Sequence, residues 1–429
     1  MKLWDKGYKI DSLIEDFTTK EDRKLDLLLA RYDVQGSMAH AAMLRSIGYL
    51  SEDELIKIQI ELEKIAKNIN AGKFIIEDGV EDVHSQVEML LVKAIGDIGK
   101  KIHLGRSRND QVLLDLRLFY RDQLDHLIHK VSGIAETVLN LSDQHSKDLM
   151  PGYTHMQMAM VSSFGMWFGA YAESMIEDIS FLKNTRQQIN KNPLGTAAGY
   201  GSSIPLDRSM TTELLEFDAL CVNSVFAQMA RGKTELLVSY GIAQLAFTFG
   251  KLAMDVCHFS SQNFGFMKLS DEFTTGSSIM PHKKNPDVFE LIRANCSLLS
   301  TLPQQLQSII TNLTSGYHRD FQLLKEVIFP AIEKVNQVLD LTHHALPELR
   351  IIPPDLSEEK YKYLFSVEVV NDLVKKGVPF RDAYKKVGQD IENGDFQPLR
   401  ELNHTHLGSI GNLGNDLLRE RLLKIRENL

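Results

Sequence analysis

The chain of 429 residues is long enough for about three average domains, and its hydrophobic content of 43% suffices for a large core. Its formal charge of −9 argues against a nucleic-acid partner or an anionic membrane surface, because both select a basic face. The three cysteines lie far apart without metal-ligand spacing, and the N-terminus has no apolar run of signal-peptide length. We therefore expect a cytoplasmic protein with free thiols and neither a nucleic-acid nor a membrane partner.

Proline placement predicts long uninterrupted helices. No proline precedes Pro151, and none lies between Pro205 and Pro281. Because proline breaks helix interiors, such gaps favour helices of many turns. The stretch 235–260 within the second gap is apolar almost all round, as expected of a helix buried among others. These features predict an all-α fold.

A first helical domain is expected over residues 1–104, and the polar segment around residues 100–107 is interpreted as the hinge that follows it. Next, apolar residues recur at helical spacing from Val112 to about Ser146, without the alternation of a strand. The pattern predicts the first long helix of a central bundle domain, residues 105–350. Its apolar positions are Leu113, Leu116, Leu118, Leu124, Leu127, Ile128, Val131, Ile134, Val138 and Leu141.

A polar cluster directly before this helix contains Ser107, Arg108 and Asn109. A planar guanidinium suits a carboxylate, and the start of a helix adds N–H donors for an anion. For these residues alone, a helix N-cap with a salt-bridged surface is an equally good interpretation.

A second polar cluster, residues 150–157, is interpreted as a turn that leads into an apolar helix, with Thr154 and His155 beside its first turn. A histidine becomes a good acid or base only where its surroundings tune it, and Glu290 could do so. A lone histidine is more often a satisfied core or surface residue. The following aromatic and methionine cluster is interpreted as core packing: Met166, Trp167, Phe168, Tyr171 and Met175.

The segment 274–290 combines small hydroxyls, ammonium groups, an amide and a carboxylate. Gly276, Pro281 and Pro286 predict a loop over residues 276–286, followed by a helix that begins near Pro286. The free N–H groups of that helix start would favour an anion, as would the lysine side chains. Lys-Lys-Asn-Pro alone would suit a solvated basic turn, whereas the full set suits carbanion chemistry on a carboxylic acid. Its members are Ser277, Ser278, Lys283, Lys284, Asn285 and Glu290.

A third polar cluster contains Tyr317, Gln322 and Lys325. These side chains could bind polar substrate groups, although an ordinary amphipathic helix start has a similar composition. The pair Pro353-Pro354 breaks the chain, and the more charged residues 351–429 predict a small C-terminal helical domain.

Together these motifs resemble the argininosuccinate lyase family, within the fumarase and aspartase superfamily, over nearly the whole chain. The Gly-Ser-Ser turn with Met-Pro-His-Lys-Lys-Asn-Pro is similar to the superfamily's signature loop. The narrower resemblance is carried by residues 33–40, 105–111, 151–155 and 376–381, with Ala383.

The resemblance implies an almost wholly helical, three-domain chain that forms a homotetramer through its central bundle. Each active site of that family combines residues from three chains. The implied reaction is the β-elimination of argininosuccinate to arginine and fumarate, without a cofactor or a metal.

The resemblance also implies roles for single residues. Ser277 is the expected base, Lys283 and Asn285 would stabilise the dianionic intermediate, and His155, oriented by Glu290, would assist the departing nitrogen. The expected substrate-binding residues are Ser107, Arg108, Asn109, Thr154, Ser278, Asn285, Tyr317, Gln322, Lys325 and His84.

Several residues depart from the family pattern near the expected ligand. His282 replaces the usual Gln, Asp22 stands where a Ser is common, and Gly232 stands where an Asp commonly follows Arg231. They leave open a sibling lyase that releases fumarate from another succinylated amine, such as adenylosuccinate. A noncatalytic, crystallin-like relative is the third alternative.

Overall fold

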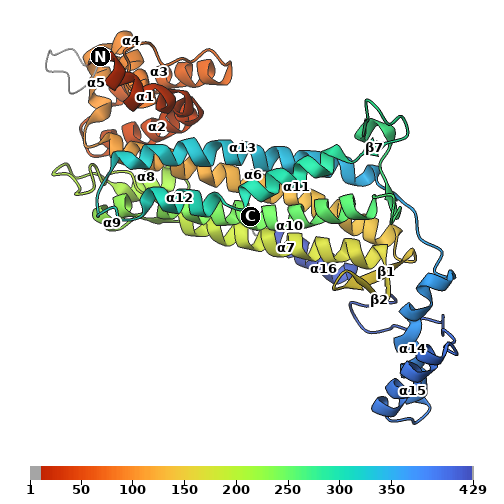
Figure 1. Ribbon diagram of the computed structural model, residues 1–429. Coiled ribbons are helices and arrows are strands. Elements are labelled where there is room, and N and C mark those ends of the chain that lie inside the picture. The colour runs from red at the N-terminus through yellow and green to blue at the C-terminus, as the bar shows by residue number, and fades with distance from the viewer. Residues whose placement is uncertain (1–10, 428–429) are drawn as a thin grey trace. The chain divides into compact units, whose positions relative to one another are not determined.

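The computed structural model of the chain describes residues 11–427 and is mostly helical, which confirms the predicted fold class (Figure 1). The α-helices are α1 (Ser12–Asp26), α2 (Ala30–Ser46), α3 (Glu52–Asn70), α4 (Val83–Ile95), α5 (Asp97–Lys100), α6 (Arg108–Gln144), α7 (Phe164–Ile189), α8 (Arg208–Leu214), α9 (Ser224–Met229), α10 (Lys233–Phe259), α11 (Asp287–Leu299), α12 (Leu302–Ile310), α13 (Gln322–Ala345), α14 (Ser366–Lys375), α15 (Phe380–Asn393) and α16 (Asn415–Arg426).

Short strands, which the sequence did not predict, pair two by two. The antiparallel pairs are β1 (Leu149–Thr154) with β2 (Gln157–Ser163), β5 (Met267–Lys268) with β8 (Arg350–Ile351), and β6 (Thr275–Gly276) with β7 (Lys284–Asn285). The parallel pair is β3 (Lys191–Asn192) with β4 (Ala219–Leu220).

The described residues fall into two compact units, whose boundaries run through long helices. The predicted three-domain division at residues 104 and 350 stays a prediction. Unit 1 contains the chain up to residue 128 with residues 181–244 and 298–336, and unit 2 contains residues 129–180, 245–297 and 337 onward.

In unit 1, the helices α2, α3 and α4 enclose a core of their own. Ser51 begins α3 with a capping box: its Oγ accepts from the Glu54 N–H at 3.2 Å, and the Glu54 carboxylate accepts from the Ser51 N–H at 3.0 Å. Such a cap contributes about 1 kcal/mol by pairing N–H groups that a helix start leaves free. Apolar residues at helical spacing then face α2 and α4, among them the fully buried Ile58 and Leu62.

The long helices pack on each other within each unit. In unit 1, Phe119 of α6 meets Phe329 of α13 with ring centroids 4.6 Å apart. In unit 2, a Cβ on Gly250 of α10 would lie only 3.0 Å from the Cβ of Cys296 on α11, so the small residue permits the close approach of these helices. All ten apolar positions predicted for α6 are buried.

Helix α10 confirms the predicted long helix, but it is not buried all round. Tyr240 and Phe247 are exposed by 47% and 63% in the single chain. By length and composition, the stretch Ser224–Phe259 would also suit a membrane span, yet 56% of its most apolar window is buried, as is usual for the core helix of a soluble protein.

The C-terminal part of unit 2 has two small cores. Val370 on α14 packs with Ala383 and Val387 on α15. Tyr361 and Phe365 pack with Val161 of β2. The three cysteines are free thiols, of which Cys221 and Cys296 are buried and Cys257 is half-buried.

Candidate active site

Thr154 and His155 lie on a β-hairpin rather than beside a helix start, so that prediction was wrong. Strands β1 and β2 pair Thr154 with Gln157, which leaves His155 and Met156 as a two-residue turn with φ of 52° and 62°. Positive φ at both positions is the type I′ geometry that matches the twist of paired strands. Helix α7 begins only at Phe164, because the hairpin takes up the residues between. The turn holds His155 exposed at its tip.

The signature loop is also closed by a short hairpin, where the sequence predicted only loop. Strands β6 and β7 pair Thr275 with Asn285 and Gly276 with Lys284. The next two positions along this register are Ser277 and Lys283, at the mouth of the loop. Paired positions in antiparallel strands lie within about 5.5 Å, so the register directs the expected base and the expected cation to the same end of the hairpin.

Local bonds shape the loop beyond this point. The Ser277 Oγ accepts from the Ile279 N–H at 3.3 Å and from the Met280 N–H at 3.1 Å, a serine turn that satisfies loop donors. Lys284 pairs with Asp271, and the Thr275 hydroxyl donates to Asp287 at the start of α11. Ser278 and Lys283 are exposed, whereas Ser277 and Asn285 are half-buried.

Glu290 stands in the first turn of α11, which begins at Asp287 as predicted. Its carboxylate lies 3.9 Å from Arg293, and within residues 11–427 no hydrogen bond or ion pair joins it to His155. Orientation of His155 by Glu290 therefore stays a prediction.

In unit 1, His84 lies at the centre of a buried ionic network. Its Nδ1 is 2.8 Å from Asp33 of α2 and 3.6 Å from Asp115 of α6. Arg108, from the first turn of α6, donates to the Ser85 hydroxyl at 2.7 Å and pairs with Asp82 at 3.0 Å. Three helices thus converge on His84.

The charges of this network set its protonation. Burial by itself disfavours the imidazolium, but the nearby Asp33 and Asp115 carboxylates outweigh it and raise the pKa of His84 to about 9. Burial, with repulsion from Asp33, raises the pKa of Asp115 well above its ordinary value. Among the described residues, none hydrogen-bonds to the buried Nε2 of His84, so the protonated ring has an N–H that is not satisfied.

The ligand atoms of Asp33, His84 and Asp115 all lie within 4.8 Å of one another, a spacing that a metal ion could use. A histidine ligand must be neutral, and here the carboxylates favour the protonated ring. Arg108 beside Asp82 adds another positive charge nearby. An internal ion pair therefore describes these three residues better than a metal centre.

The polar cluster at the start of α6 also caps that helix, which was one of the two interpretations left open by the sequence. The Ser107 Oγ accepts from the Asn109 N–H at 3.3 Å, as a helix cap does. Asp110, which the sequence analysis did not single out, accepts from the Ser107, Gly195 and Ala197 N–H groups at 2.8 to 2.9 Å. Mainly because it is buried, its pKa is raised to about 6.

The third cluster is organised by two carboxylates of α1. The Nζ of Lys325 lies 2.6 Å from Asp22 and 2.6 Å from Asp26, and Gln322 donates to Asp22 at 2.8 Å. Lys325 is only 2% exposed, and although burial opposes its charge, Asp26 and Asp22 raise its pKa. Spacing of Asp22 and Asp26 by one helical turn was a signal for this pair, but their partner lies about 300 residues away along the chain.

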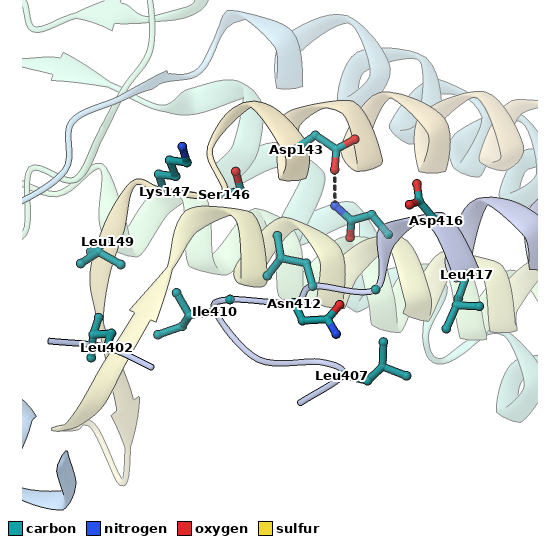
Figure 2. A pocket seen from close by; sticks show the side chains of 14 residues that line it. Asp143, Ser146, Lys147, Leu149, Leu402, Leu407, Ile410, Asn412, Asp416 and Leu417 are labelled. Atoms are coloured by element: carbon teal, nitrogen blue, oxygen red, sulfur yellow. Dashed lines mark hydrogen bonds between the residues drawn. The ribbon is translucent and has the colours of Figure 1, made fainter. Parts of the chain in front are cut away.

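Unit 2 also contains cavities. The larger one, of about 780 Å³, lies between the end of α6 and the loop before α16 (Figure 2). Its Asp143 already accepts from Asn415 at 2.7 Å and pairs with Arg419 at 2.5 Å. A second cavity, of about 400 Å³, lies under the hairpin that carries His155.

The candidate residues therefore form two groups. Unit 1 contributes buried ion-pair networks and Tyr317, which is 40% exposed, and unit 2 contributes the two hairpins. The unit 1 group is His84, Ser107, Arg108, Asn109, Tyr317, Gln322 and Lys325, and the unit 2 group is Thr154, His155, Ser277, Ser278, Lys283, Asn285 and Glu290.

Comparison with known proteins identifies the family. Residues 6–299 match a family model described as Lyase. The chain is 56% identical to the argininosuccinate lyase of Bacteroides fragilis, over 97% of this chain and 93% of that protein. It is 39% identical to the argininosuccinate lyase of Stenotrophomonas maltophilia, over 98% of both chains.

Solved structures share the fold at low sequence identity. EDDS lyase in complex with formate superposes with a TM-score of 0.77 at 23% identity, over 98% of this chain and 92% of that one. A class II fumarase from Schistosoma mansoni has a TM-score of 0.71 at 15% identity, over 93% and 87% of the two chains. With the signature loop, the polar clusters and these relatives together, the chain belongs to the argininosuccinate lyase family.

Proposed function

We propose that the protein cleaves argininosuccinate into arginine and fumarate by β-elimination in the cytoplasm. The single observation that carries this proposal is the identity of 56% to an argininosuccinate lyase over 97% of the chain. The hairpin whose last pair, Gly276 with Lys284, lies next to Ser277 and Lys283 supports it, as do the free thiols, which suit a reducing compartment.

The difficult step is removal of a proton from the carbon next to a carboxylate. The electron pair left behind moves into that carboxylate, which then carries two negative charges. Lys283 can neutralise one of them, Asn285 can donate hydrogen bonds, and the N–H groups at the start of α11 add a favourable dipole. Stabilisation of this dianion supplies most of the rate enhancement.

Ser277 is the proposed base. A hydroxyl is far too weakly acidic to serve in water, so its alkoxide requires a nearby cation and the exclusion of solvent. Ser277 and Lys283 directly follow and precede the last paired residues, Gly276 and Lys284, so we propose that Lys283 is the cation and that the exposed segment beyond closes over the substrate. The Ser277 oxygen takes the proton, and the electron pair of the broken C–H bond moves into the neighbouring carboxylate.

The dianion then collapses: its electron pair forms the carbon–carbon double bond of fumarate and breaks the bond to the guanidino nitrogen. That nitrogen leaves with the pair of electrons and takes up a proton, which His155 can supply or position from the exposed hairpin tip. Arginine and fumarate are then released, and Ser277 returns its proton to solvent. No cofactor takes part in this proposal.

The residues of unit 1 are proposed to hold the substrate. His84 is included because its protonated ring has an unsatisfied N–H at the buried Nε2, which a substrate carboxylate reaches only if the network opens, and Arg108 beside it adds a guanidinium. Thr154 and Ser278 from unit 2 add hydroxyl groups. The remaining proposed substrate-binding residues are Ser107, Asn109, Tyr317, Gln322 and Lys325.

We further propose that the chain acts as a homotetramer with active sites shared between chains. Tyr240, Phe247 and Met254 of α10 are spaced by seven residues, so they lie on one face of the helix, and each is at least 46% exposed in the single chain. An apolar stripe of this kind is normally covered by another helix.

The reaction is tested by following fumarate absorbance when purified protein is mixed with argininosuccinate. Ser277→Ala is expected to fold normally and to lose activity by at least about a thousandfold, as removal of a catalytic nucleophile or base does. Ser308→Ala on α12, an exposed serine whose hydroxyl donates to the Gln305 carbonyl of its own helix, is the matched control. Full turnover by a folded Ser277→Ala variant would refute the assigned base.

Adenylosuccinate is the competing substrate, favoured by His282 in the signature loop. The same assay with adenylosuccinate separates the two. Fumarate release from adenylosuccinate alone contradicts the proposed substrate but leaves the β-elimination standing. Absence of fumarate from both substrates would instead indicate a noncatalytic relative.

A further inference from the structure

The cavity under the β1–β2 hairpin has no role in the proposed reaction. It encloses about 400 Å³, within the range of small-molecule sites. Its wall contains no Lys or Arg, and Asp255 is its carboxylate. The residues that line it are Met150, Pro151, Gly152, Tyr153, Met156, Ser162, Met166, Trp167, Ala170, Asp255, His258 and Phe259.

Asp255 of α10 is held in place from α7. Its Oδ2 accepts from the Trp167 indole N–H at 3.0 Å and from the Tyr171 hydroxyl at 2.7 Å. Both donors are neutral, so the carboxylate is oriented but its charge is not balanced. Between residues 11 and 427, no ion pair involves Asp255, and Lys251, one turn earlier, lies over the Phe247 ring instead.

Aromatic rings line the same cavity as this carboxylate. Trp167 lies 6.2 Å from Phe259 in nearly perpendicular orientation, and Phe259 lies 6.4 Å from Tyr153 of the hairpin. The faces of such rings are negative and attract flat organic cations, most of all when the site is partly desolvated. Carboxylate and rings therefore select the same kind of ligand.

We propose that this cavity is a binding site for the guanidinium group of a small molecule. A guanidinium is planar, so it can stack on Trp167 or Tyr153 while it donates to Asp255. Burying a carboxylate without a basic partner costs free energy, and a bound cation would reduce that cost. Trp167 is thus both a ring of the site and a donor that positions Asp255, rather than core packing alone.

Binding is measured with a probe at Trp167. The chain has two tryptophans, Trp4 and Trp167, so 5-fluorotryptophan gives two fluorine resonances, which Trp167→Phe assigns. The full-length protein is titrated with methylguanidinium, with neutral methylurea of the same shape, and with arginine. We expect the Trp167 resonance to shift and saturate with both guanidinium compounds and to stay unchanged with methylurea.

Variants separate this site from an unspecific effect of salt. Asp255→Asn keeps an oxygen that can accept from Trp167 and Tyr171 but removes the charge, and it should weaken methylguanidinium binding by about tenfold or more. Glu177→Gln, an exposed carboxylate of α7, removes the same charge elsewhere and should change nothing.

Equal responses to methylguanidinium and methylurea, or unchanged binding by Asp255→Asn, would overturn the proposal. A shift with arginine that Asp255→Asn does not weaken would place arginine at another site and would also count against it. Fumarate release by the same Asp255→Asn preparation reports on the lyase reaction separately, because Asp255 takes no part in it.

Discussion

His84 and Lys325 are buried cations whose charges are held by carboxylates from other helices. Asp33 and Asp115 flank His84, and Asp26 lies 2.6 Å from Lys325. Removing one partner of such a buried pair leaves an uncompensated charge, which costs several kcal/mol. Keeping both partners of each buried pair therefore matters for the stability of the fold.

Replacement of His84 by Gln should make stability less dependent on pH. The folded-state pKa of about 9 is above the ordinary value of 6.5. A raised histidine pKa contributes stability that is fully present below pH 6.5 and is lost as the pH rises through about 9, with an upper bound of about 3 kcal/mol. The loss of Tm in His84→Gln should therefore be larger at pH 6 than at pH 10.

The matched control for this measurement is His129→Gln, an exposed histidine of α6. It should lower Tm slightly or not at all, and equally at both values of pH. Equal losses at pH 6 and pH 10 for His84→Gln would mean that the imidazolium is not the stabilising form.

The sequence indicated candidate residues, but it could not indicate which residues pair with them. Ser107 carries out the N-cap role that was left open, and His84 was found through family resemblance. Asp26 and Asp115 were not found, because their significance depends on Lys325 and His84, which only folding brings near. Burial and long-range pairing have no local pattern in the chain.

The hairpin of β1 and β2 shows how a turn rather than a helix positions a catalytic candidate. His155 and Met156 both adopt positive φ, which costs a non-glycine residue about 1 kcal/mol or more. Strands on both sides impose this geometry through the pairing of Thr154 with Gln157. The backbone at His155 is consequently fixed, and its side chain is exposed at the tip of the turn.

Substitutions at Met156 should reveal this constraint. Met156→Gly removes the steric cost of positive φ and should keep or slightly raise Tm, whereas the β-branched Met156→Val should destabilise the protein by about 1 kcal/mol. At Met158, within β2, the order should reverse, because glycine weakens a strand and valine suits it. The same order at both positions would contradict the type I′ turn.

Long helices were predicted well and short strands were not. Apolar residues at helical spacing located α6, and the absence of proline located α10, because each signal repeats over many turns. Strands β6 and β7 have two residues each, too short for any alternating pattern. Their pairing is decided by the turn between them, so the sequence predicted only a loop.

At the scale of the whole molecule, the single chain leaves an apolar face uncovered on α10. Tyr240, Phe247 and Met254 expose side chains that a soluble protein normally covers. From the sequence we interpreted this helix as buried on all sides. In the proposed tetramer, a neighbouring chain would cover its exposed face. The distinction between burial within a chain and burial between chains cannot be drawn from hydropathy.

Phe247→Asp should therefore reduce the mass of the protein in solution. Light scattering should give four chains for the parent protein and fewer for this variant, because a charge in an apolar helix interface is strongly unfavourable. Fumarate release should fall with the mass if active sites are shared between chains.

Ile60→Asp is the matched control, since Ile60 on α3 is 47% exposed and lies outside the α10 stripe. It should retain four chains and full activity. A tetramer that survives Phe247→Asp would place the interface elsewhere, and a monomeric parent protein would refute the shared sites.

The ion pairs of Lys325 with Asp22 and Asp26 affect how the chain can fold while it is being synthesised. A nascent polypeptide presents both acids long before the ribosome reaches position 325 of 429. Until Lys325 has been synthesised, Asp22 and Asp26 lack this ion-pair partner, and α1 cannot complete its packing. Fragments cut short of that lysine should consequently leave their leading helix open to proteases.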